Sequence, residues 1–191
     1  MVNLIKPNDA ELEFLTLSYN RFYDLFDEII SEEFWKKDEW YRYSRIKDGF
    51  SIYIEVIHYE PIKFVIEQIK KNRPPMESEI GSDVFKFIRN LIIHFPFFDC
   101  WNKVWINKSL ANWNKEGQFI DKFLRNYTGK GEVKYRFWEE DKKLMTYLSV
   151  KFPKSYTNDD KIYLKDLLNE KEGVKFSFIL MKKILDTQVL K

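Results

Sequence analysis

Two side chains in the middle of the chain have the chemistry needed to cleave a phosphodiester bond. Arg89 and His94 enclose the residues Asn-Leu-Ile-Ile in a strongly apolar segment. An imidazole gives or takes a proton near neutral pH, and a guanidinium stays positive at any relevant pH. RNA carries its own nucleophile, the 2′-hydroxyl, so such a pair needs no metal ion and no covalent enzyme intermediate. In this hypothesis His94 is the general acid or base, and Arg89 stabilises charge on the phosphoryl oxygens.

The spacing of these residues on a helix decides which of them meet. Asn90 and His94 are four residues apart and share one helical face, so the Asn90 amide is expected to orient the imidazole. Arg89 and His94 point about 140° apart on an ideal helix. They meet only if the Arg89 stem reaches around the helix end, or if a second copy of the helix crosses the first in a dimer. A competing interpretation, which the spacing alone favours, is structural: a surface ion pair for Arg89 and a helix C-terminus for His94.

Most other catalytic and binding motifs are missing from the sequence. No phosphate loop, dinucleotide-binding glycine fingerprint or Gly-x-Ser-x-Gly motif is present. Two histidines and the single Cys100 cannot supply a zinc site without several carboxylates. The second histidine, His58, stands close to Pro61 and has no set of partners, so we expect it to be structural. We therefore expect neither a metal ion nor another cofactor.

The composition predicts one folded domain spanning residues 1–191. Hydrophobic residues make up 45% and aromatic residues 18%, enough for a packed core, while six Gly and six Pro are few for an all-β protein. A formal net charge of +2 does not make the whole surface attractive to nucleic acid, so any RNA contact needs a local patch. One cysteine, no secretory signal and no transmembrane segment predict a cytoplasmic protein without a membrane partner.

Hydrophobic periodicity predicts a helical bundle. The expected helices cover residues 8–33, 39–71, 79–95, 115–127, 159–169 and 175–190, with a short aromatic helix at 99–106. Val133, Tyr135 and Phe137 alternate with polar residues after the turn Gly129-Lys130-Gly131, which predicts a small β-hairpin within residues 129–153. The predicted fold class is mainly α, with the hairpin as an addition to the bundle.

A stretch rich in basic and aromatic residues overlaps the predicted hairpin. Exposed aromatic side chains interleaved with Lys and Arg stack on bases and bind phosphates. Acidic residues at Asp121, Glu132 and 139–141 offset most of this charge, so the favoured interpretation is a solvated face over a half-buried hairpin. Three tryptophans, Trp101, Trp105 and Trp113, are likewise expected in the core or in an interface. The stretch comprises Lys122, Arg125, Lys130, Lys134 and Arg136, with Tyr127, Tyr135, Phe137 and Trp138.

The segment from Arg89 to His94 resembles the motif of the HEPN superfamily. That motif is an Arg, four to six residues and then a His, often with a polar residue directly after the Arg; here four residues intervene and Asn90 fills the polar position. The resemblance covers residues 84–97. It implies a helical bundle and a homodimer that brings two motifs into one cleft. It also implies metal-independent RNA cleavage, with Arg89, Asn90 and His94 in the site.

Proteins of this superfamily occur in toxin–antitoxin, abortive-infection and CRISPR-associated systems, so the resemblance also implies an antitoxin as a partner. The variant that is paired with nucleotidyltransferase antitoxins has a Tyr three positions after the His. This chain has Phe97 there, which argues against adenylylation at that position.

The sequence leaves two functional hypotheses. The first is a HEPN-like, metal-independent endoribonuclease of a toxin–antitoxin or phage-defence system, which acts on RNA as a homodimer. The second is a helical binding or assembly protein with a HEPN-like fold and no catalysis. Cleavage of RNA in the presence of EDTA distinguishes them, because only the first predicts it.

Overall fold

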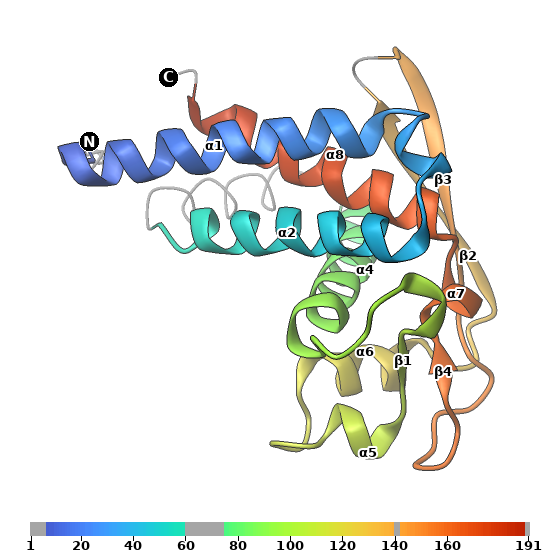
Figure 1. The fold of residues 1–191 in the computed structure, drawn as a ribbon. Helices are drawn as coiled ribbons and strands as arrows, with labels where there is room; N and C mark the ends of the chain where they lie inside the picture. Colours follow the sequence, from blue (N-terminus) through green and yellow to red (C-terminus); the bar gives the residue numbers. More distant parts are fainter. Residues whose placement is uncertain (1–6, 60–74, 140–141, 190–191) are drawn as a thin grey trace. The chain divides into compact units, whose positions relative to one another are not determined.

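The computed structural model describes residues 7–59, 75–139 and 142–189, in which helices predominate (Figure 1). The chain divides into two compact units, residues 1–74 with 178–191 and residues 75–177. The C-terminal helix α8 (Glu170–Val189) gives its first residues to the second unit and the rest to the first. The predicted fold class is confirmed, since the fold is mainly helical and carries a small antiparallel hairpin.

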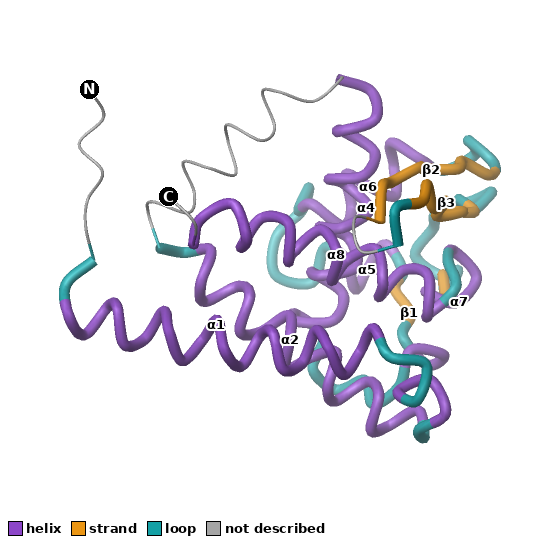
Figure 2. Tube along the Cα trace, turned by 90° about the horizontal axis from the view of Figure 1, so that it is seen from above, coloured by secondary structure: helices purple, strands orange, loops and turns teal. Residues whose placement is uncertain are grey.

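The first unit is built on two long helices that lie side by side (Figures 1 and 2). They are α1 (Asp9–Ile30) and α2 (Glu39–Ile57), joined through the short 3-10 helix η1 (Phe34–Lys36). Phe178 of α8 stacks on Phe22 of α1 with ring centroids 6.0 Å apart. Gly49 of α2 makes this packing possible, because a Cβ at that position would lie 2.5 Å from Cζ of Phe178.

Local hydrogen bonds explain where these helices begin and end. At the start of α1 the Asn8 side chain accepts from the Glu11 amide at 2.9 Å, and the Glu11 carboxylate accepts from the Asn8 amide at 2.8 Å. The helix predicted to reach residue 33 ends at Ile30, where the Ser31 hydroxyl donates to the Glu28 carbonyl. The prediction of a helix over 39–71 holds as far as Ile57, and residues 60–71 lie outside the described part.

The second unit combines one long helix with shorter elements and two small sheets. Helix α4 (Pro75–His94) is followed by η2 (Trp101–Lys103), β1 (Trp105–Ile106), α5 (Lys108–Ala111), α6 (Phe119–Tyr127), β2 (Glu132–Glu139), β3 (Leu144–Lys151), β4 (Ile162–Tyr163) and α7 (Leu164–Leu167). β2 pairs with β3 and β1 pairs with β4, both antiparallel. The hairpin predicted within residues 129–153 is therefore present.

Two helix predictions in this unit were wrong. Residues 99–106 form a three-residue 3-10 helix and then a strand, and residues 159–169 hold the strand β4 and the four-residue α7. Trp105 and Ile106 pair with Tyr163 and Ile162, more than fifty positions away along the chain. Because each segment pairs with a distant partner, the pairing does not show as a hydrophobic periodicity within either segment.

Helix α4 is fixed on two sides within the second unit. Phe87 stacks on Phe123 of α6 with ring centroids 4.3 Å apart. Gly81 lies against Tyr135 of β2, since a Cβ there would lie 2.6 Å from Cζ of the tyrosine. The helix that carries Arg89, Asn90 and His94 is thus held firmly near its start and along its length. None of the helices in residues 7–59, 75–139 and 142–189 combines the length and apolarity that a membrane crossing requires.

Candidate active site at the end of helix α4

The last turn of α4 presents His94 to solvent. The helix ends at His94 because Pro96, two residues later, has no backbone N–H to continue the hydrogen-bonding pattern. His94 is exposed, while Leu91 and Ile92 in the same turn are buried and anchor it. The imidazole is therefore accessible on a rigid element, as a group that exchanges protons with a substrate must be.

Arg89 and Asn90 are joined to each other through their side chains. Nε and Nη2 of Arg89 donate to Oδ1 of Asn90 at 3.2 and 3.0 Å. Asn90 is nearly buried, with 9% of its surface exposed, and Arg89 is half-buried. Both residues are described, and no side-chain hydrogen bond joins Asn90 to His94. The Asn90 amide is expected to orient the imidazole, but its oxygen accepts from the guanidinium instead.

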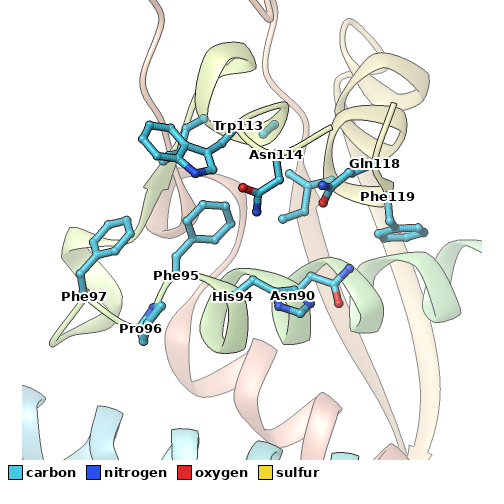
Figure 3. A pocket seen from close by; sticks show the side chains of 12 residues that line it. Asn90, His94, Phe95, Pro96, Phe97, Trp113, Asn114, Gln118 and Phe119 are labelled. Atoms are coloured by element: carbon cyan, nitrogen blue, oxygen red, sulfur yellow. The ribbon is translucent and has the colours of Figure 1, made fainter. Parts of the chain in front are cut away.

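A pocket of about 810 Å³ opens at this end of the helix (Figure 3). Asn90 and His94 line it from α4, and the side chains of Trp113, Asn114, Gln118 and Phe119 face them from the opposite wall. The twelve described lining residues include no acidic side chain and do not include Arg89. The remaining members are Phe95, Pro96, Phe97, Leu110, Ala111 and Ile120.

The walls of the pocket are aromatic and its polar groups are mostly amides. Two of the aromatic side chains are strongly exposed, Phe97 at 64% and Trp113 at 78%. Asn114 and Gln118 offer both donors and acceptors, which is how proteins read the edge of a nucleobase. Lys86 adds positive charge beside the pocket, with its Nζ 5.5 Å from the ring centre of Phe119. This combination suits a flat, polar-edged, anionic ligand.

A buried carboxylate holds the wall that faces α4. Oδ1 of Asp121, which is fully buried, accepts from Nδ2 of Asn112 at 2.9 Å and from the Tyr156 hydroxyl at 3.1 Å, and Oδ2 pairs with Arg125. Burial raises the pKa of Tyr156 to about 12, against the opposing charge of Arg125, so the phenol keeps its proton and donates it to Asp121.

The same network closes the loop that carries Trp113 and Asn114. Oδ1 of Asn112 accepts from the Gly117 amide at 2.9 Å. Gly117 has φ +68°, a left-handed conformation that glycine adopts without strain. Asp121 thus fixes Asn112, and Asn112 fixes the turn that places the aromatic and amide groups over the pocket.

The structure brings only two of the three predicted site residues into one pocket. Asn90 and His94 line it. Arg89 bonds to Asn90 but does not line the pocket. The opposite wall could not be predicted from the sequence, because Trp113, Asn114 and Gln118 belong to no motif. Of the tryptophans predicted in the core or in an interface, Trp101 is buried, whereas Trp113 is exposed and does not lie in the core. The run Asn112-Trp113-Asn114 beside Gly117 is the one local signal of an exposed turn.

The remaining His and Cys residues and the acidic side chains bear on a possible metal site. In that part of the chain no three His, Cys, Asp or Glu side chains converge in a way that would hold a metal ion. Cys100 is buried and His58 lies at the exposed C-terminal end of α2. Among the described residues that line the pocket, His94 carries the one side chain suited to acid–base chemistry.

Comparison with known proteins adds no assignment to this geometry. No family model matches the chain, and no curated protein and no solved structure matches it.

Proposed function

We propose that this protein is a metal-independent endoribonuclease that holds single-stranded RNA in the pocket at the end of α4. The observation that carries the proposal is the exposed His94 on the rim of a pocket walled by aromatic rings and amides, with no acidic side chain among its described lining residues. A nucleobase fits between such walls by stacking and by hydrogen bonds along its edge. The adjacent ribose and phosphate then lie near the imidazole.

The reaction follows from the groups present. His94 takes the proton of the 2′-hydroxyl, and the 2′-oxygen attacks the neighbouring phosphorus. The bond from phosphorus to the 5′-oxygen breaks, and that oxygen takes a proton from an acid, either water or the imidazolium of a second copy. The products are a 2′,3′-cyclic phosphate and a 5′-hydroxyl end. The Arg89 guanidinium, held by Asn90, supplies positive charge for the phosphoryl oxygens.

A cleavage assay with matched variants tests this function. The wild-type protein is incubated in EDTA with a labelled single-stranded RNA, beside the His94→Ala and Arg89→Ala variants. We expect wild-type cleavage to leave cyclic phosphate ends, and a loss of about a hundred-fold or more in each variant. A matched control is His58→Ala, because His58 is also exposed at the C-terminal end of a helix. The same RNA with 2′-deoxyribose throughout should stay intact.

Three outcomes would remove the enzymatic proposal. They are no cleavage by the wild type, equal cleavage by the His94→Ala variant, and cleavage of the 2′-deoxy strand. The first of these favours a second candidate function, a pocket that binds without catalysis. One observation supports that candidate: Arg89 lies outside the lining of the pocket and bonds to Asn90. Retained binding of the RNA without any cleavage identifies it.

A further inference from the structure

The β2–β3 hairpin has two faces of opposite character. Side chains alternate between the faces of a strand, and the pairing of Tyr135 with Leu148 and of Arg136 with Tyr147 fixes which residues share a face. Tyr135 and Phe137 both pack on Phe176, each with ring centroids 5.4 Å apart. A slip of one residue would expose these rings, so the packed face locks the register of the other.

The outer face carries cations and aromatic groups together. Its eight positions are Glu132, Lys134, Arg136 and Trp138 on β2, and Met145, Tyr147, Ser149 and Lys151 on β3. Three cations and one anion give these positions a net charge of +2 (3 − 1). Trp138 is 44% exposed and Tyr147 is 57% exposed. This is the local positive patch that the near-neutral chain as a whole does not provide.

The two strands place the cations beside the rings. Arg136 is directly opposite Tyr147, and Trp138 is opposite Met145 in the next row on the same face. Lys134 lies opposite Ser149 in the row on the other side. Exposed aromatic rings stack on bases whatever the sequence of the nucleic acid strand. The cations between the rings bind its phosphates. A row of alternating base and phosphate contacts is the arrangement that an extended single strand offers.

The one anion of the face lies at its far end. Glu132 pairs across the hairpin with Lys151, and its carboxylate accepts from the Ser149 hydroxyl. That hydrogen bond, together with Lys151 and Lys134, lowers the pKa of Glu132, so its charge is matched by its neighbours. The other three outward positions of β2, Lys134, Arg136 and Trp138, contain no acidic group.

We infer that the outer face of the β2–β3 hairpin is a binding surface for single-stranded RNA. Eight residues in each strand give it a length of about 26 Å, enough for a site of about four nucleotides. Trp138 and Tyr147 stack on bases, and Lys134 and Arg136 bind the phosphates between them. This surface is distinct from the pocket at the end of α4 and binds whether or not that pocket is catalytic.

Fluorescence anisotropy with a labelled twelve-residue oligouridylate tests the inference. All variants are made in the full chain carrying His94→Ala, so that cleavage does not disturb the measurement. We expect the pair Trp138→Ala and Tyr147→Ala to weaken binding at least ten-fold. The pair Lys134→Ala and Arg136→Ala should reduce the slope of log K against log salt by about 1.4.

Controls of the same residue types come from outside the hairpin. Trp40 is 65% exposed on α2 and Lys37 is exposed just before it, so Trp40→Ala and Lys37→Ala should leave the affinity within two-fold. Circular dichroism of each variant establishes that the fold is retained. An unchanged affinity in both hairpin pairs, or equally tight binding of a duplex of the same length, overturns the inference.

A second measurement separates this inference from the proposed cleavage. A dinucleotide such as UpU is too short to reach beyond one site, so its cleavage reports on the pocket alone. The hairpin variants with an intact His94 should cleave UpU like the wild type while cutting long RNA more slowly at low concentration. If UpU cleavage falls together with long-RNA cleavage, the hairpin acts on the pocket and is not a separate binding surface.

Discussion

At the scale of single residues, Asn90 is the side chain whose role changes most once the structure is considered. Its position four residues before His94 predicted a hydrogen bond to the imidazole. Instead its oxygen accepts two N–H groups of the neighbouring Arg89. Asn90 lines the pocket and accepts from the guanidinium, so within the proposed function it is a positioning residue for Arg89.

This role predicts a specific pattern of kinetic effects. Asn90→Ala should lower kcat/KM for RNA cleavage by about ten-fold, because the guanidinium loses the two hydrogen bonds that it donates to Asn90. In the Arg89→Ala background the same change should have no further effect, since nothing remains to be positioned. Cleavage rates of the two single variants and the double variant measure this coupling.

Asn126 of α6 provides the matched control for this prediction. Asn126→Ala removes an exposed asparagine of α6 that takes no part in the pocket, and it should leave kcat/KM unchanged. A further loss when Asn90→Ala is added to Arg89→Ala would show that Asn90 acts on a different group. His94 would then be the first candidate.

At the scale of elements, the pocket depends on how a loop is attached to a helix. The loop between α5 and α6 carries Trp113 and Asn114, and Asp121 on the first turn of α6 holds it through Asn112. Asp121 is fully buried, while its partner Arg125 is half exposed. A buried carboxylate with three donors stabilises its surroundings only while every donor is in place.

Removal of this carboxylate should loosen the loop and weaken the fold. Asp121→Ala removes the acceptor of the Tyr156 hydroxyl and one of the two acceptors of the Asn112 amide, at a cost of about 2–4 kcal/mol in the free energy of unfolding. Urea denaturation followed by tryptophan fluorescence measures the change. Asp99→Ala is the matched control, because Asp99 makes an exposed pair with Lys103 and its loss should leave the free energy of unfolding nearly unchanged. Equal losses in the two variants would contradict the assigned role of Asp121.

The elements that could be predicted from sequence are those whose signals are local. Asn8 and Glu11 form the capping box that starts α1, and the alternation of Val133, Tyr135 and Phe137 identifies β2. The β1–β4 pair was missed because Ile106 and Ile162 are distant in sequence and each strand has only two residues. The same lack of a local signal limits what the sequence predicts about the candidate active site.

One wall of the pocket comes from residues that are close together in the sequence on one helix, and the other wall does not. Asn90 and His94 share a helix, so their common face follows from their spacing. The loop that brings Trp113 to the pocket is held in part by the buried Asp121, an acidic residue that the sequence does not distinguish from its solvated neighbours. Lys134, Arg136 and Trp138 of the hairpin's outer face stand out in the sequence, but Tyr147 joins them only once the register is known.

The position of Arg89 bears on whether one chain or two chains form a complete candidate site. His94 lines the pocket of its own chain, and Arg89 does not. The two side chains leave the helix about 140° apart, which separates them further. A dimer resolves this geometry if the Arg89 of one chain reaches the His94 pocket of the other. The resemblance to the HEPN superfamily carries the same expectation of a homodimer.

Mixing two inactive variants tests this composite site. The Arg89→Ala chain keeps His94, and the His94→Ala chain keeps Arg89. In a mixed dimer with shared sites, one site has lost both groups and the other is intact. Random exchange of equal amounts therefore restores about a quarter of wild-type cleavage, because half of the dimers are mixed and half of their sites are whole. Light scattering should give the wild type a mass of twice 23.4 kDa. If the mixture of verified dimers stays inactive, both groups act within one chain, and Arg89 must then reach its own pocket by leaving Asn90.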